Sequence, residues 1–448
     1  MRAECHFAKA GQGLFYNGIL YGENRAKFTF VYDCGTHQFT RRGSSALRKS
    51  ITDFRDIMGK RLDLLFISHF DRDHISHIPE LIDGKQLGTV VIPYIDLDMR
   101  VLITSTFFPK YIEDNDDVEN EDRNDLIDFV QNPIRFFRER GAEKIIILYG
   151  NDENAEDPNE VNFPPSPKPD SPPSSVIDKG DLYKENDSKN VQSDDTNESG
   201  VEIIKYGRFA YIIACHFAWE FKTLNPYIKQ IDNERLRVEF SEILQKYDIK
   251  KRRSAFSNSD CTIELRRLYK KYFAEINESS LIVRSRPLTK YRQLNESHSS
   301  QPCQFYTNCG CKCLYCDYDL TNNSFNHGDM EYADTLLTGD ISLNSHIADC
   351  LRTTYRGMFD FYTPQIMLIP HHGSKTSIHD DWCSRVSYCL GNVRTSLVLS
   401  YGRRNTFNHP DIRCFWRCPS IEPRQQLKLR SVNEEQDFSY TVFFYDTK

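Results

Sequence analysis

Short apolar runs of strand length alternate with polar loops over the first hundred residues. The run 62–68 (LDLLFIS) is almost continuously apolar, which is typical of a strand that is buried on both faces. The residues that follow place Ile75, Ile78 and Leu81 at helical spacing, and the run 90–95 (VVIPYI) returns to the strand pattern. This alternation predicts a layered α/β architecture.

The second half of the chain repeats this pattern. The segment 201–219 (VEIIKYGRFAYIIACHFAW) predicts a hairpin, and residues 228–273 are charged and favour helix. Three further apolar runs, 334–340 (DTLLTGD), 364–374 (PQIMLIPHHGS) and 395–402 (TSLVLSYG), each lead into a polar motif. Functional loops gather at the ends of buried strands, so a site is expected where these runs end.

Two segments interrupt the pattern. Residues 151–200 hold seven of the 19 prolines and few large apolar residues, so they cannot bury enough apolar surface to offset the entropy lost on ordering. Residues 287–330 are irregular and rich in cysteine. The pattern therefore predicts a single domain over residues 1–448, with a disordered acidic and proline-rich insertion at 151–200 and a Cys-rich insertion at 287–330.

Composition narrows the class of protein. The net charge of −7, from 57 basic and 64 acidic side chains, argues against a protein that coats polyanions in general, although a local basic groove stays compatible with it. The apolar runs are too short to span a membrane, and the first residues show no secretory apolar region. With 14 scattered cysteines, we expect reduced thiols, a cytoplasmic location and no membrane partner.

The densest chemical signal is the string HFDRDH at 69–74, directly after the first buried run. Alternate residues of an extended loop point the same way, so His69, Asp71 and Asp73 are able to converge, and His74 turns in with the start of a helix. Two imidazoles and two carboxylates within so short a string suit a divalent metal ion. The alternative is a solvated acidic loop with incidental histidines.

Two later strand ends carry compatible groups. Asp340 follows the first of the three late runs, and the pair His371 and His372 follows the second. A single carboxylate can bridge two metal ions, and a histidine can complete the second coordination sphere. Taken alone, Asp340 also fits an ordinary Asx-turn, and His371 fits a partly buried histidine with satisfied hydrogen bonds.

Together these motifs resemble the metallo-β-lactamase superfamily. The likeness is carried by ISHFDRDHISHIPEL, YDCG, TGD, IPHHGSKTS and SYGRRNTFNHP, over roughly residues 10–100 and 200–415. It is greatest to the hydrolase domain of ComEC-type DNA-uptake competence proteins, which reads HxDxDH where most of the superfamily reads HxHxDH. The resemblance implies a hydrolase with a four-layer αββα metallo-β-lactamase sandwich, here carrying two irregular insertions.

The resemblance also implies two divalent metal ions, Zn²⁺ or Mn²⁺. The implied metal ligands are His69, Asp71, Asp73, His74, Asp340 and one of His371 and His372. His372 is favoured, with His371 packing behind it. Asp71 stands where zinc enzymes of this fold usually have an imidazole, and the added oxygen donor makes Mn²⁺ a competitor to Zn²⁺.

Two further residues acquire implied roles. Asp33 in YDCG resembles an early structural aspartate that braces the metal loop. His409 in NHP would face the site as a substrate contact or a proton donor. The superfamily's separate histidine between the first motif and TGD has no clear counterpart, and its nearest candidate, His216, is better explained as a core or strand-face histidine.

Other polar groups are open to two interpretations. Ser374, Lys375 and Thr376 could bind a phosphate through hydrogen bonds or charge, although a polar helix start accounts for them slightly better. Basic stretches at 250–253 and 266–271 could touch a nucleic-acid backbone, but a solvated helical face explains them equally well.

The Cys-rich insertion offers a possible structural zinc site. Its candidate ligands are Cys309, Cys311, Cys313 and Cys316. Four thiolates would close a tetrahedral site, but only Cys313 and Cys316 have CxxC spacing. The alternative is a set of free thiols in a loop that needs no metal.

The best-fitting reaction is phosphodiester hydrolysis by a metal-activated water, with Asp73 orienting the water and His409 serving as an acid for the leaving group. The expected enzyme is a phosphodiesterase or nuclease acting on nucleic acid or a nucleotide. One alternative is a hydrolase of a small ester, lactone or lactam, and another is a catalytically silent binding protein of the same fold. The insertions would be places for a protein partner to bind.

Overall fold

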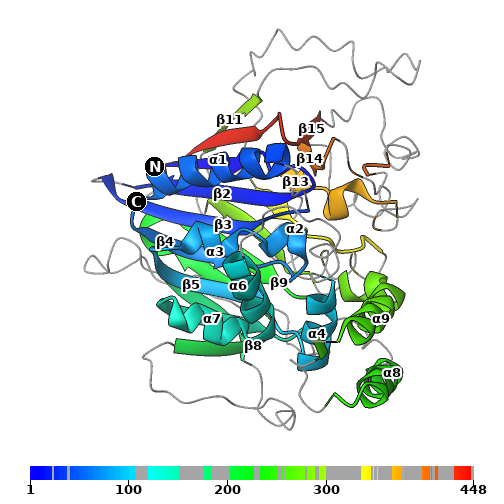
Figure 1. Cartoon of the computed structure of the whole chain (residues 1–448). Helices are drawn as coiled ribbons and strands as arrows, with labels where there is room; N and C mark the ends of the chain where they lie inside the picture. Colours follow the sequence, from blue (N-terminus) through cyan, green and yellow to red (C-terminus); the bar gives the residue numbers. More distant parts are fainter. Residues whose placement is uncertain are drawn as a thin grey trace, which may run out of the picture.

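The fold is described from a computed structural model of the chain (Figure 1). The structure describes residues 1–22, 25–37, 41–106, 120–150, 176–182, 202–226, 233–249, 255–256, 258–277, 280–287, 292–298, 334–344, 347, 351, 366–375, 377, 396–403, 405, 409–411 and 428–444. Within these residues, no helix combines the length and the apolar character that crossing a membrane requires.

One long sheet forms the framework. Its strand order is β11-β16-β1-β2-β3-β4-β5-β6-β8-β9-β10-β12-β13-β14-β15, and β7 pairs with β8 beside this path. The strands are β1 (Arg2–Phe7), β2 (Gly13–Tyr21), β3 (Lys27–Thr36), β4 (Arg61–Phe66), β5 (Gln86–Pro93), β6 (Ala142–Leu148), β7 (Val176–Leu182), β8 (Glu202–Ala214), β9 (Trp219–Leu224), β10 (Ile282–Pro287), β11 (Arg292–His298), β12 (Thr335–Leu337), β13 (Ile366–Leu368), β14 (Ser396–Ser400), β15 (Lys428–Val432) and β16 (Phe438–Phe444).

The sheet folds over on itself at β8. The first part of this strand pairs in parallel with β6, and its second part pairs antiparallel with β9. The two halves of the sheet therefore pack face to face. Phe221 of β9 lies between them, with its ring centroid 5.0 Å from Phe30 and 5.5 Å from Phe66, which belong to β3 and β4.

Helices cover the outer face of the first half of the sheet (Figure 1). The helices are α1 (Arg41–Met58), α2 (Arg72–Ile75), α3 (Ile78–Ile82), α4 (Leu97–Ser105), α6 (Asn120–Gln131), α7 (Pro133–Glu139), α8 (Asn233–Lys246) and α9 (Ser259–Asn277), with short 3-10 turns η5 (Cys215–Phe217) and η8 (Pro370–Gly373).

Two apolar cores result from this layering. In β6, Ile145 and Ile147 join the core under the helices, whereas Ile146 and Leu148 join the core between the two halves of the sheet. A parallel strand buried on both faces needs such a continuous apolar run, because its alternate side chains enter different cores. The predicted layered α/β architecture is confirmed. An outer helical layer over the second half of the sheet is not among the described residues, so this part of the predicted αββα sandwich stays a prediction.

Most of the strands that the sequence predicts are present. The structure differs from the prediction after the HFDRDH string and in the two insertions. The helical spacing after the HFDRDH string is realised as two short helices, α2 and α3. The chain turns between them because Pro79, the second residue of α3, lacks an N–H, while the N–H of His77 donates to the backbone carbonyl of Cys34.

The segments predicted to be irregular contain strands. Within 151–200, residues Val176–Leu182 form β7, which pairs antiparallel with β8. Within 287–330, residues Arg292–His298 form β11, which extends the sheet at β16. Both strands add to existing strands, where backbone hydrogen bonds order a segment whose composition alone gives no strand signal. The remainder of both insertions lies outside the described residues.

Replacing Phe221 by alanine tests the contact between the two halves of the sheet. Phe221 is fully buried, so its removal leaves a cavity and we expect the free energy of unfolding to fall by about 3–5 kcal/mol. Chemical denaturation followed by circular dichroism measures this change. In the control Ile57→Ala, on the exposed side of α1, the change should stay within about 0.5 kcal/mol. Equal losses in the two variants would contradict the packing described.

Candidate metal centre

The candidate site lies where strands of both halves of the sheet end. The loop after β4 meets the start of β10, because Leu281 donates its N–H to the carbonyl of Ser68 at 2.8 Å. The turns after β12 and β13 are joined by a hydrogen bond of 3.2 Å from the N–H of His371 to the carbonyl of Gly339. These contacts bring together three loops that are far apart in the sequence.

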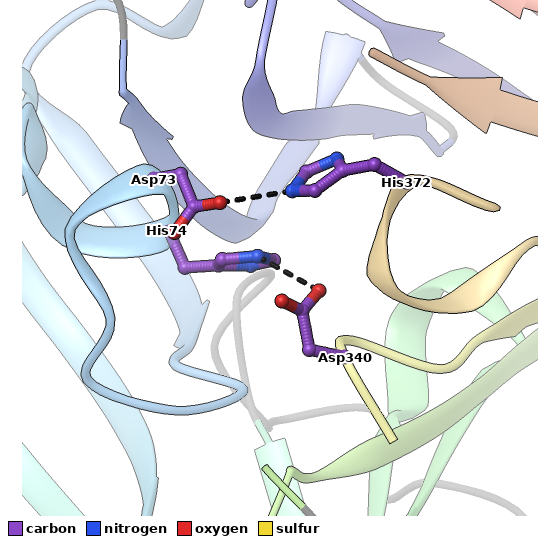
Figure 2. A group of neighbouring side chains, drawn as sticks. All are labelled: Asp73, His74, Asp340 and His372. Atoms are coloured by element: carbon purple, nitrogen blue, oxygen red, sulfur yellow. Dashed lines mark hydrogen bonds and ion pairs between the residues drawn. The ribbon is translucent and has the colours of Figure 1, made fainter. Parts of the chain in front are cut away.

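Four buried side chains form the centre of the site. Ligand atoms of Asp73, His74, Asp340 and His372 all lie within 4.8 Å of one another (Figure 2). His74 Nε2 is 3.1 Å from Asp340 Oδ1, and His372 Nε2 is 2.9 Å from Asp73 Oδ2. Two residues come from the HFDRDH string and two from the later strand ends, as the sequence predicts for their positions.

A second group of side chains surrounds the other oxygen of Asp340. His69 Nε2 lies 3.7 Å from Asp340 Oδ2, and His371 Nε2 lies 3.9 Å from the same atom. The carboxylate of Asp71 is 3.9 Å from His69 Nε2. Asp340 thus presents one oxygen to each group. His371, expected behind His372, instead faces this second oxygen.

The histidines of the first loop are held by one buried carboxylate. His74 Nδ1 donates to Asp33 Oδ2 at 2.8 Å. The hydroxyl of Ser68 also donates to Asp33, which leaves the Ser68 oxygen to accept from His69 Nδ1 at 2.8 Å. Both rings therefore donate through Nδ1, which leaves Nε2 as the atom that faces the site.

The other two histidines are held in the same way. His372 Nδ1 donates to the carbonyl of Ser400 at 2.7 Å, and His371 Nδ1 lies 2.8 Å from the hydroxyl of Ser377. All four imidazoles are thus fixed at Nδ1 by a protein group, and the Nε2 atoms face the carboxylates. Such a partner on the far ring nitrogen orients a metal-binding histidine and fixes its tautomer.

Asp33 reaches this position through a β-bulge. In the pairing of β2 with β3, Phe15 lies opposite Cys34 and Tyr16 lies opposite Tyr32, so Asp33 is the extra residue. Its φ of 57° is in the left-handed region, which few residues other than glycine adopt. A bulge of this kind turns a side chain away from the regular alternation, and here it directs Asp33 toward Ser68 and His74.

The backbone of the later turns is also unusual. His371 and His372 have φ of 47° and 53°, a conformation that costs roughly 1–2 kcal/mol per residue. Gly339 has φ of 56°, and a Cβ there would lie 3.0–3.1 Å from Ser280, Ser68 and Tyr32. Glycine in the TGD motif is therefore needed both for the turn and for close packing against the first loop.

The buried charges of the site affect one another. Burial raises the pKa of Asp340, but the neighbouring ring of His74, followed by that of His371, lowers this pKa well below its usual range. Burial lowers the pKa of His74, but Asp340 and Asp73 raise it well above its usual range. Burial and then the charge of His74 lower the pKa of His69 to about 3, which keeps this ring neutral. Burial and Asp73 raise the pKa of Asp71 to about 7.

The residues fit a divalent metal. Among the described residues, the buried Nε2 atom of His69 has no hydrogen-bond partner, and that of His74 meets the carboxylate of Asp340 at 3.1 Å. Burying polar atoms in this way is costly unless something binds them. Neutral imidazoles and carboxylates are the ligands that Zn²⁺ and Mn²⁺ take, and a cation would balance the adjoining carboxylates.

The remaining predicted residues lie at different distances from the centre. The ring of half-buried His409 lies 5.3 Å from that of His371, at the border of the site. Ser374 is buried behind the turn and donates its N–H to the carbonyl of His371, whereas Lys375 is exposed. Thr376 lies outside the described residues. Outside them, too, lie the proposed zinc ligands Cys309, Cys311, Cys313 and Cys316.

His216 lies away from the site. It belongs to the turn between β8 and β9, and the adjoining Trp219 pairs with Pro287 at the end of β10. The opposite end of β10 contacts the loop after β4, which carries the HFDRDH string. At about 3.3 Å per residue, the strand separates the two by roughly 20 Å. His216 therefore cannot replace the missing histidine, which agrees with its interpretation as a structural residue.

Two residues of the site give no signal in the sequence. His37, just after β3, places Nε2 3.3 Å from Asp73 Oδ2 and keeps 28% of its side chain exposed. Tyr269 of α9 donates its hydroxyl to both oxygens of Asp71, at 2.8 and 3.0 Å. Neither residue belongs to a motif, and only the fold brings them to the HFDRDH string.

Comparison with known proteins gives little. No family model and no curated protein matches the chain. Among solved structures, the chain is similar to a long form RNase Z from yeast, with 9% sequence identity and a TM-score of 0.30. The similarity covers 97% of this chain and 41% of that protein, so the chain spans less than half its length. A likeness this low does not transfer an activity.

Replacing Asp33 by asparagine tests how the histidines are held. Asp33 accepts from the Ser68 N–H on Oδ1 and from the Ser68 hydroxyl and His74 on Oδ2. An amide has only one acceptor oxygen and must lose one side of this arrangement, so we expect affinity for Zn²⁺ to fall about 10–100-fold. Calorimetric titration of metal-free protein measures this.

Asp63→Asn is the matched control. Asp63 is also buried, and it accepts hydrogen bonds from Thr29 and Arg61 toward the other end of β4. This variant should lose stability but keep its affinity for Zn²⁺. An unchanged affinity in Asp33→Asn, or the same loss in both variants, would contradict the role given to Asp33.

Proposed function

We propose that this protein is a metal-dependent hydrolase of the metallo-β-lactamase type that cleaves phosphodiester bonds in nucleic acid or a nucleotide. One observation carries the proposal. Three buried imidazoles (His69, His74 and His372) and the partly buried ring of His371, each fixed at Nδ1, turn Nε2 toward the carboxylates of Asp73 and Asp340. Within the described residues the buried Nε2 atom of His69 has no hydrogen-bond partner, so it is free to bind a metal ion.

Two divalent cations, Zn²⁺ or Mn²⁺, would share Asp340. The first would be held by Asp73, His74 and His372, and the second by His69, Asp71 and His371. His371 takes the part of the histidine that the superfamily has elsewhere in its sequence. When bound, such cations lower the pKa of water and stabilise the negative charge that develops on a phosphoryl group.

The protein's own groups supply orientation and proton transfer. Asp73 orients the attacking water through its carboxylate. His409 is placed to give a proton to the leaving oxygen, because it borders the centre beside His371. Burial, followed by the charge of His371, lowers the pKa of His409 to about 4. The ring is therefore neutral near pH 7, and it would serve as an acid only where the negative charge of a bound phosphodiester raises this pKa.

A phosphate-containing substrate fits the surroundings better than a small neutral ester. His37 is partly exposed beside Asp73, and Lys375 is exposed directly after the η8 turn, so both can meet an anionic substrate as it enters. Arg267 and Lys270 add exposed positive charge on α9, the helix that carries Tyr269. A lactone or lactam would make no use of this charge.

Hydrolysis assays test the proposal. Purified protein with Mn²⁺ or Zn²⁺ should cleave bis-p-nitrophenyl phosphate and at least one of plasmid DNA, single-stranded DNA and RNA, and a chelator should abolish the activity. His372→Ala should lower the rate at least about 100-fold, because it removes a direct metal ligand.

The matched control is His6→Ala. It removes a histidine of β1 that is hydrogen-bonded to Asp437. Its rate should equal that of the wild type. Hydrolysis of a lactone alone would favour the small-ester alternative. Silence on every substrate, in wild type and variant alike, would favour a binding protein that has lost its chemistry.

A further inference from the structure

Tyr269 connects a helix outside the metal-bearing loops to the candidate site. Its side chain is 5% exposed, and its hydroxyl donates to both oxygens of Asp71, a residue 198 positions earlier in the chain. The helix that carries it, α9, packs against α4 and α8 and contributes Leu265 and Leu268 to the core under the helices. The phenol is thus presented by a firmly packed element.

The orientation of Asp71 depends on this one hydrogen-bonding partner more than the orientations of Asp73 and Asp340 depend on any single partner. It stands at the N-cap of α2 with extended backbone, but its side chain makes no capping hydrogen bond. Asp73 and Asp340 face several imidazoles, whereas the imidazole nearest to Asp71, that of His69, is 3.9 Å away. Among the described residues, the shortest side-chain hydrogen bond of Asp71 is the one of 2.8 Å from Tyr269.

We propose that Tyr269 is a positioning residue for Asp71 and thereby sets how tightly the second of the two cations is held. The inference rests on the proposed function, since it assumes a two-cation site. A carboxylate has about four lone-pair positions, so a single phenol donor fixes its orientation and leaves positions for a cation. Groups that orient a ligand in this way typically change metal affinity 10–100-fold when they are removed.

The side chains that would hold the first cation are fixed by other contacts. Asp73, His74 and His372 are anchored through Ser400, Asp33 and their mutual contacts, none of which involves α9. Loss of the phenol should therefore affect one binding step and leave the other. This selectivity separates positioning from a general loss of structure, which would weaken both steps.

Tyr269→Phe tests the inference, with Tyr272→Phe as the matched control. Tyr272 lies on the same helix and donates its hydroxyl to Glu239, away from the site. Metal-free protein is dialysed against a series of Zn²⁺ concentrations, and bound zinc is measured by atomic absorption. In Tyr269→Phe the first equivalent should bind within about 2-fold of wild type and the second about 10–100-fold more weakly. Tyr272→Phe should bind both equivalents as the wild type does.

The visible spectrum of the Co²⁺-loaded protein provides a second readout. The bands that grow with the second equivalent should change in Tyr269→Phe, and those of the first should not. In an Asp71→Ala background, adding Tyr269→Phe should have no further effect, because the phenol then has no carboxylate to position.

The outcomes separate the two proposals. If the wild type binds two equivalents and Tyr269→Phe binds both unchanged, or binds the second more tightly, the role of Tyr269 is overturned while the two-cation site stands. If the wild type binds one equivalent or none, the two-cation site fails and the role of Tyr269 fails with it.

Discussion

The site depends on one constraint: each imidazole must be held at Nδ1 by a fixed protein group, so that Nε2 is left to face the centre. Asp33 satisfies this constraint for two rings at once, directly for His74 and through Ser68 for His69. A rotation of any ring would break a buried hydrogen bond without replacing it, which costs about 1–3 kcal/mol. The ring orientations are therefore set by the fold before any metal binds.

The backbone is shaped to meet this constraint. Asp33, His371 and His372 all adopt left-handed conformations, which non-glycine residues avoid elsewhere in regular structure. Such strain persists only where the surroundings hold it in place. Here the sheet holds Asp33 through the β2–β3 bulge, and the hydrogen bond from His371 to Gly339 joins the two later turns. Local strain is thus maintained by a large, well-packed framework.

Much of this arrangement follows from the sequence. Apolar runs mark β4, β5 and β14, and the rule that functional loops follow buried strands predicts that Asp340 and His372 lie near the HFDRDH string, where the structure has them. Asp33, which the sequence predicts as a brace for this loop, accepts hydrogen bonds from Ser68 and His74.

Other features could not be read from the sequence. Tyr269 lies in a helix whose tyrosines look alike in the pattern, and only the packing of α9 decides that this one enters the site. Likewise, His37 contacts Asp73 only because the fold brings these two residues together, and the spacing between them in the sequence does not predict this. The strands within the predicted insertions add to edges of distant strands, so their order comes from partners rather than from their own composition.

Anomalous diffraction from crystals grown with Zn²⁺ would test the central claim most directly. Data collected on either side of the zinc absorption edge should place one peak about 2.0–2.2 Å from His74 Nε2, His372 Nε2 and carboxylate oxygens of Asp73 and Asp340. A second peak should lie among His69, Asp71 and His371, on the other side of Asp340. Zinc bound elsewhere on the molecule, with these four imidazoles still turned toward the carboxylates, would contradict the account.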